Sequence, residues 1–154
     1  MTPIQMITAV AAASNGGYLV QPHVVKEETD QNGNVVKTFG TTVKRQVISA
    51  ETSKEIDNLL QNEVEDGSGK NAYVAGYQIG GKTGTAQKLG PSDPNGSVAS
   101  FVGVAPIDDP QIAVIVILDD PHNPVSNYGS VIGSGQTVTS QTPYAGIGIQ
   151  KMGQ

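Results

Sequence analysis

Cysteine and tryptophan are absent from this chain of 154 residues, and aromatic residues make up only 5% of it. The lack of cysteine excludes disulfide bonds, thiolate catalysis and cysteine-ligated metal sites. Basic residues are also few, because nine Lys and Arg stand against 14 Asp and Glu, for a formal net charge of −5. They are scattered along the chain, so nucleic acid is a poor candidate partner.

Long apolar runs are missing as well. No stretch approaches the roughly 18 apolar residues that a membrane-spanning helix requires. Thr2 and Pro3 follow Met1, where a signal segment would carry basic residues. We therefore expect no membrane segment within the chain, and any export signal would lie outside these residues.

Two segments have the apolar spacing of helices. The first begins at Thr2, which can cap a helix together with Gln5, and stops at the glycines of residues 15–17. The second follows Ser49, with Asp57 expected to face solvent. The residues expected to face inward on this second helix are Ile56, Leu59, Leu60 and Val64.

The rest of the pattern is that of turns and strands, in keeping with 19 Gly and 9 Pro. Two β-prone stretches flank Asn32 and Gly33, which predicts a hairpin. Strands are expected over residues 77–85, 98–105 and 112–118, the last two antiparallel because the link between them is short. The predicted fold class is α+β, an antiparallel sheet with helices packed on it. No regular element is expected from residue 126 onward.

The sharpest motif is the segment Gly80–Gln87, which reads GGKTGTAQ. Strand alternation places Lys82 and Gly84 on one face and Thr83 and Thr85 on the other. Glycines in such a strand allow another backbone or a ligand to approach closely. The segment is therefore expected to line a binding cleft.

Residues 76–83 also match the phosphate-binding loop pattern G-x-x-x-x-G-K-[ST], and Asp119 follows an apolar strand as in nucleotide hydrolases. That loop must follow a buried strand and open into a helix. Here a polar loop precedes it, and Gly84, Gly90 and Pro91 follow. A nucleotide hydrolase is kept as an alternative with little support.

A second enzyme class uses Lys-Thr-Gly together with Ser-x-x-Lys and Ser-x-Asn elements. In order and spacing, residues 1–125 resemble the C-terminal portion of the transpeptidase domain of class B penicillin-binding proteins. The segments that carry this resemblance are residues 1–6, 15–17, 67–72, 76–77, 82–87 and 99–106. Residues 126–154 depart from the family's closing helix and are interpreted as a divergent or poorly ordered tail.

The resemblance implies a peptidoglycan D,D-transpeptidase that cross-links cell-wall stem peptides and binds β-lactams, on the extracytoplasmic face of the bacterial membrane. It implies catalytic roles for Lys82 and Thr85, the lysine as a positive charge and Thr85 through a backbone N–H in the oxyanion hole. It implies substrate-binding roles for Thr83, Gly84 and Thr85. No cofactor and no metal site are expected.

The nucleophile of that family is missing from the sequence. No serine stands three residues before a lysine, and none stands two residues before an asparagine. We therefore expect the isolated chain to be inactive, with the missing N-terminal part of the domain as its partner. A non-catalytic peptidoglycan-binding fragment is the remaining alternative.

Overall fold

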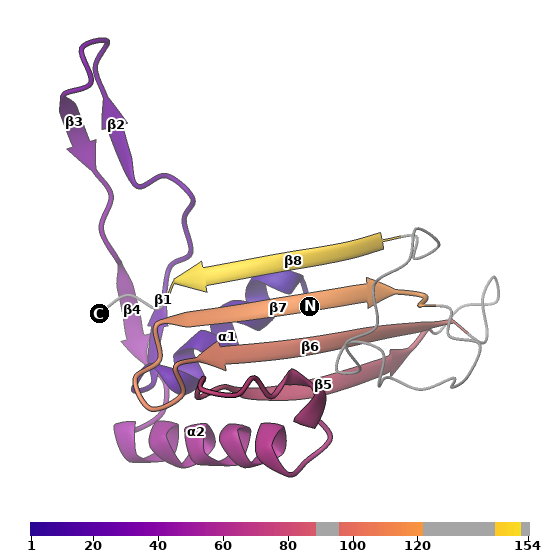
Figure 1. Ribbon diagram of the computed structural model, residues 1–154. Coiled ribbons are helices and arrows are strands. Elements are labelled where there is room, and N and C mark those ends of the chain that lie inside the picture. The colour runs from indigo at the N-terminus through magenta and orange to yellow at the C-terminus, as the bar shows by residue number, and fades with distance from the viewer. Residues whose placement is uncertain (89–95, 122–143, 152–154) are drawn as a thin grey trace.

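The computed structural model describes residues 1–88, 96–121 and 144–151 (Figure 1). Helix α1 (Pro3–Ser14) begins with the predicted capping box: Thr2 Oγ1 accepts a hydrogen bond from Gln5 N at 3.4 Å, and Gln5 Oε1 accepts one from Thr2 N at 2.8 Å. The helix ends at Ser14, with Asn15 as its C-cap, and Gly16 follows with a φ of 82°, which suits glycine. Both predicted ends of this helix are confirmed.

Helix α2 (Ala50–Glu65) begins as predicted, with Ser49 Oγ accepting a hydrogen bond from Thr52 N at 3.2 Å. The predicted inward face is partly wrong, because Leu59 is 68% exposed and Asp57 is buried. The inward stripe is formed by Ser53, Asp57, Leu60 and Val64, which recur at helical spacing. The polar residues of this stripe lie near the end of α1, where Ser53 Oγ donates to Ala13 O at 2.7 Å.

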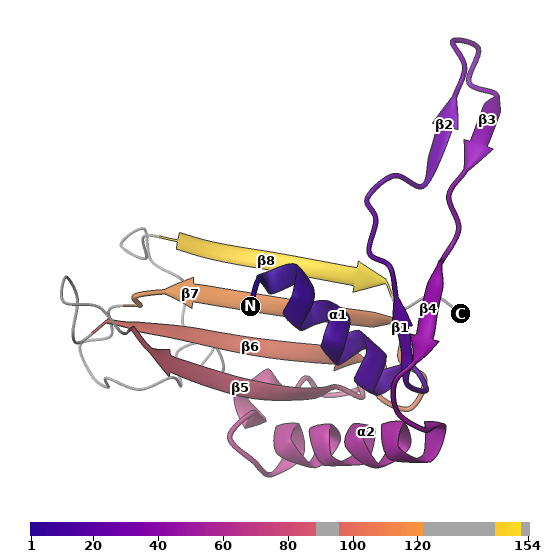
Figure 2. The same cartoon turned by 180° about the vertical axis from the view of Figure 1, so that it is seen from behind.

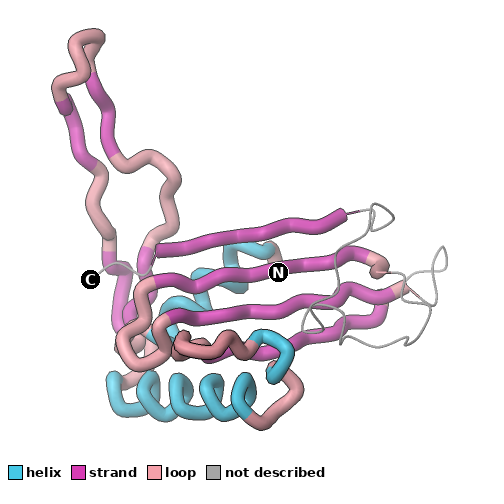
Figure 3. Tube along the Cα trace, in the orientation of Figure 1, coloured by secondary structure: helices cyan, strands magenta, loops and turns pink. Residues whose placement is uncertain are grey.

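The segment that connects the two helices contains two short pairs of antiparallel strands (Figure 3). Strand β1 (Tyr18–Val20) pairs with β4 (Val43–Gln46), and β2 (Glu27–Thr29) pairs with β3 (Val35–Thr38), both antiparallel. The predicted hairpin at Gly33 is confirmed: Gly33 has a φ of 83°, and the Asp30 carboxylate accepts the backbone N–H groups of Asn32 and Asn34, each at 2.9 Å. Figure 1 shows that β2 and β3 stand away from the rest of the structure.

The main sheet has the strand order β5-β6-β7-β8, and every pair is antiparallel. The first three strands are β5 (Gly80–Gln87), β6 (Ser97–Ala105) and β7 (Ile112–Asp119), which confirms the predicted antiparallel strands. Strand β5 starts three residues later than expected, because Gly76, with a φ of 86°, and Tyr77 still belong to a turn. A fourth strand, β8 (Tyr144–Lys151), pairs with β7 where the sequence predicted no regular element.

The helices cover one face and one edge of this sheet (Figure 2). Helix α1 crosses one face, and the buried core between them contains Ile7, Ala11, Val104, Ala113 and Ile115. Helix α2 lies along β5, the edge strand. A short 3-10 helix, η1 (Lys70–Ala72), leads from α2 toward β5. The sheet and its two helices confirm the α+β class, and they bring the C-terminal end of α2 beside the Lys-Thr-Gly segment.

Candidate functional site

The turn that follows α2 is wrapped tightly around Glu63. Gly69 N donates to Glu63 O at 3.0 Å, and Ser68 N donates to Glu63 Oε1 at 3.1 Å. A Cβ atom on Gly67 would lie 2.7 Å from Glu63 O, so only glycine fits at this position without a shift. The two glycines thereby place the Ser68 side chain over the Glu63 carboxylate.

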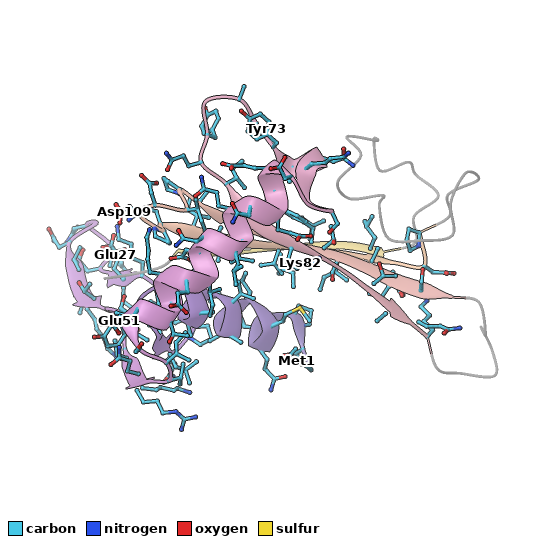
Figure 4. All side chains as sticks on the ribbon, turned by 90° about the horizontal axis from the view of Figure 1, so that it is seen from below. Met1, Glu27, Glu51, Tyr73, Lys82 and Asp109 are labelled. Atoms are coloured by element: carbon cyan, nitrogen blue, oxygen red, sulfur yellow. The ribbon has the colours of Figure 1, made fainter. Side chains whose placement is uncertain are left out.

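Lys82, which is labelled in Figure 4, belongs to strand β5 and forms an ion pair with this carboxylate. Its Nζ lies 2.9 Å from Glu63 Oε1, 3.1 Å from Ser68 Oγ and 3.3 Å from Thr83 Oγ1. Ser68 Oγ lies 2.8 Å from Thr83 Oγ1 and also donates to Glu63 Oε1. Glu63, Ser68, Lys82 and Thr83 therefore form one hydrogen-bonded group, called the lysine cluster below.

The lysine cluster is polar and open to solvent on one side. The Lys82 side chain is 56% exposed and the Glu63 side chain is 26% exposed. The hydrogen bond from the Ser68 hydroxyl, followed by that from the Lys82 ammonium, holds the pKa of the Glu63 carboxyl below its ordinary value. Glu63 is therefore ionised at neutral pH and balances the charge of Lys82.

The glycines of β5 serve different purposes. A Cβ atom on Gly80 would lie 2.5 Å from Ile107 Cδ1, and one on Gly81 would lie 2.4 Å from Phe101 Cζ. Side chains of the protein itself thus fill the space beside these two glycines. At Gly84 a Cβ atom would meet only Ser100 Oγ, at 2.8 Å, so a side-chain hydroxyl that can rotate, and not the core, lies beside this glycine.

A cavity of about 430 Å³ lies beside the second half of β5. The start of α1 contributes Met1, Pro3 and Met6 to its lining, and β5 contributes Gly84, Thr85 and Ala86. The volume is within the range of small-ligand sites. The lysine cluster and this cavity therefore lie along the same edge strand.

The structure brings together some of the predicted site residues. Lys82 and Thr83 meet in the lysine cluster although strand alternation points them to opposite faces, because the long lysine side chain bends so that Nζ reaches Thr83 Oγ1. Gly84 and Thr85 line the cavity. Sequence reasoning missed Glu63 and Ser68, which lie 19 and 14 residues before Lys82. The signal available was the Gly-Ser-Gly turn at the end of a predicted helix.

The phosphate-loop alternative does not fit the fold. Residues 76–83 pass from a turn into strand β5, where a phosphate loop would open into a helix. The apolar strand that ends at Asp119 is antiparallel to its neighbours, and Asp119 forms an ion pair with Lys88 at 2.8 Å. Without a helix N-terminus at Lys82 there is no cradle for the phosphates.

Within the described ranges, no three His, Asp or Glu side chains are arranged to hold a metal ion. The exposed His23 makes a local contact between Nδ1 and Val25 O at 2.9 Å, and His122 lies outside the described residues. No helix of the described chain is long and apolar enough to cross a membrane.

A second cavity, of about 510 Å³, lies where α1, α2 and the turn after β6 meet, and it includes Asp57 and Asp109 in its lining.

Comparison with known proteins was made on both sequence and structure. The profile of the family described as penicillin binding protein transpeptidase domain matches residues 1–137. Stage V sporulation protein D of Bacillus subtilis is 42% identical over 98% of the chain, and PbpB, a penicillin-binding protein of Mycolicibacterium smegmatis, is 33% identical over 79% of it. The chain spans 24% and 20% of the lengths of these two relatives.

Solved structures agree with the sequence relatives. The D,D-transpeptidase domain of a peptidoglycan glycosyltransferase from Eggerthella lenta superposes with a TM-score of 0.69 at 30% identity, covering 85% of this chain and 30% of that one. Penicillin-binding protein 3 of Mycobacterium tuberculosis, solved in complex with aztreonam, has a TM-score of 0.69 at 30% identity, covering 93% and 32% of the two chains.

Proposed function

Because the chain belongs to the penicillin-binding protein transpeptidase family, we propose that it is the C-terminal part of a class B D,D-transpeptidase domain. In this proposal the complete protein cross-links peptidoglycan stem peptides and is acylated by β-lactams. The observation that carries the proposal is the edge strand β5, where the lysine cluster adjoins a cavity lined by Gly84 and Thr85. An edge strand with a glycine gap can accept an extended peptide alongside it.

The reaction divides between this chain and a serine that lies outside it. The serine Oγ attacks the carbonyl carbon of the penultimate D-alanine of a stem peptide, and the bond to the terminal D-alanine breaks. An amine of a neighbouring peptidoglycan strand then attacks the acyl carbonyl carbon and releases the serine. In this chain Lys82 supplies positive charge, and the Thr85 backbone N–H forms half of the oxyanion hole.

The hydroxyls of Thr83 and Thr85 are the two candidates for binding the substrate carboxylate, Thr85 being the better placed, and Gly84 leaves room for the substrate backbone. In this proposal residues 1–125 belong to the transpeptidase domain, and residues 126–154 form a divergent tail whose strand β8 joins the main sheet. The proposed longer protein contains the remainder of the domain and a membrane anchor. The anchor would hold the site on the extracytoplasmic face of the bacterial membrane. The relative solved with aztreonam supports β-lactams as ligands.

The first test is to read the DNA upstream of the Met1 codon for in-frame Ser-x-x-Lys and Ser-x-Asn elements. The longer domain and the chain of 154 residues are then treated with penicillin G, and adducts are detected by intact mass. We expect acylation of the longer domain and none of the shorter chain. Lys82→Ala should slow acylation about 10²- to 10³-fold, the loss typical of removing one preorganised electrostatic group.

Lys26→Ala is the matched control, because Lys26 is an exposed lysine on the hairpin side of the molecule. It should leave the acylation rate unchanged. An adduct on the chain of 154 residues, or a longer domain whose acylation survives Lys82→Ala, would contradict the proposal. Muropeptide binding that survives Lys82→Ala, in a domain that penicillin never acylates, would indicate a binding module instead.

A further inference from the structure

The Lys82 ammonium is oriented by three oxygens that lie on one side of it. Nζ lies 2.9 Å from Glu63 Oε1, 3.1 Å from Ser68 Oγ and 3.3 Å from Thr83 Oγ1, and Ser68 Oγ is itself hydrogen-bonded to the other two oxygens. Because the N–H groups of an ammonium diverge tetrahedrally, oxygens this close together share the N–H groups on that side. The exposed side of the ammonium still faces any ligand in the cleft.

The hydroxyl protons of the lysine cluster follow from the same count. A hydroxyl carries one proton and two lone pairs, and an ionised carboxylate only accepts. The Ser68 proton is committed to Glu63 Oε1. The contact between Ser68 Oγ and Thr83 Oγ1, 2.8 Å long, therefore requires Thr83 to donate. The protons run in one direction, from Thr83 to Ser68 and from Ser68 to Glu63.

We propose that Glu63 is a positioning residue that fixes this proton order, so that Thr83, which also accepts from Lys82, presents its remaining lone pair, and no proton, to the cleft. The ionised Glu63 carboxylate is the terminal acceptor of the series and the partner of the Lys82 charge. Without it, the Ser68 proton would be free to turn toward Thr83, and the Thr83 proton would be free to point at a ligand.

This order divides the two threonines of β5 between different tasks. Thr83 is partly buried in the lysine cluster and its proton is used internally. Thr85 is exposed, lines the cavity, and makes no side-chain hydrogen bond with the described part of the chain. The Thr85 hydroxyl is thus the one of the two that can donate to a ligand carboxylate, and Lys82 acts on that ligand through its charge.

The experiment is a titration of Glu63 in the full chain by carbon-13 NMR of its carboxyl group. Ser68→Ala should raise the pKa of Glu63, because the first donor to the carboxylate is lost. Thr83→Val should also raise it, because a Ser68 hydroxyl that no longer accepts the Thr83 proton is a weaker donor to Glu63. Thr83→Ser should restore the original pKa. Thr85→Val, a matched change on the same strand, should leave it unchanged.

A double-mutant cycle separates this relay from simple desolvation by the valine side chain. In the Ser68→Ala background Thr83→Val should leave the pKa of Glu63 unchanged, because Thr83 acts on Glu63 only through Ser68. If Thr83→Val lowers the pKa, Ser68 donates to Thr83 and the proposed order is reversed. An unchanged pKa in Thr83→Val, or an equal rise in both backgrounds, would also overturn the inference.

The meaning of this order for ligand binding rests on the proposed function, but the titration uses no substrate. The two can therefore fail separately. A longer domain that penicillin acylates and that shows the wrong titration overturns only the proton order. A chain with the expected titration whose longer form is never acylated overturns only the transpeptidase assignment.

Discussion

Asp57 is a carboxylic acid on the inner side of α2, with 5% of its surface exposed. Burial raises the pKa of Asp57, and the Ser14 hydroxyl and the Lys54 charge oppose this effect only in part. The folded state therefore binds this proton more tightly than the unfolded state does. It follows that the contribution of Asp57 to stability is most favourable below the ordinary aspartate pKa of about 4 and is lost as the pH rises through the raised pKa.

Asp57→Asn should remove this part of the pH dependence. We expect the variant to be more stable than the parent chain at neutral pH, by on the order of 1 kcal/mol, because an ionised carboxylate no longer has to be buried. Denaturant unfolding at pH 4 and pH 7 measures the effect. Glu55→Gln, on the exposed side of the same helix, should leave the pH dependence as it is. A loss of stability at pH 7 in Asp57→Asn would show that the charged form is satisfied.

Strand β5 combines two glycines that the core needs with one that it does not. At Gly81 a methyl group would lie 2.7 Å from the backbone oxygen of Val102 as well as against Phe101. Gly81→Ala should therefore lower the free energy of unfolding by about 1–3 kcal/mol, as overpacking does. Gly84→Ala meets only the rotatable Ser100 hydroxyl, and we expect it to cost less than about 1 kcal/mol.

Urea unfolding of the two glycine variants gives the comparison directly. In the longer domain, the loss of acylation by penicillin should be large relative to the loss of stability for Gly84→Ala, and small relative to it for Gly81→Ala. Gly84→Ala places a methyl group beside the proposed ligand site, so it should slow acylation while the fold is retained. Equal effects of the two substitutions on stability would mean that β5 adjusts its position more readily than its contacts suggest.

Helix ends and strand order could be predicted from the sequence because their signals are local. The Thr2 capping box, the Ser49 cap and the short link between β6 and β7 each act within a few residues. The inner face of α2 was mispredicted because a polar contact decides it: Ser53 bonds to Ala13 O, 40 residues away, and turns Asp57 inward. Hydrophobic spacing alone does not register such a contact.

The candidate site, like the fold, could be predicted from the sequence only where its signals are local. The motif itself shows the alternation of lysine and threonine along β5, but it does not indicate that Glu63 is the partner of Lys82. Glu63 belongs to a helix whose position beside β5 is set by tertiary packing. Its spacing from Lys82 matches no repeating pattern of a helix or a strand, so the lysine cluster emerges only from the fold.

At the scale of the whole molecule, the β2–β3 hairpin, called the arm below, lies apart from the hydrophobic core. All residues of both strands are exposed, and Figure 1 shows them standing clear of the sheet. Gln21 N still donates to Thr42 O at 2.9 Å at the base of the arm. Replacing residues 22–41 by a short Asn-Gly turn should therefore change the free energy of unfolding by less than about 0.5 kcal/mol.

Circular dichroism melting of the shortened chain checks this expectation against the parent. The β1–β4 pair should survive, because its register does not depend on the removed residues. A decrease in stability greater than about 1 kcal/mol would show that the arm is held by contacts with the body of the protein.

The position of α1 across the sheet also governs the order in which the protein can be completed during synthesis. Each strand of the sheet pairs with the next strand along the chain, so these contacts join neighbouring parts of the sequence. The apolar stripe of α1 is different, because Ile7 and Ala11 are covered by Ala113 and Ile115, about a hundred residues later. The apolar side of α1 can therefore be covered by these residues only after β7 has been translated.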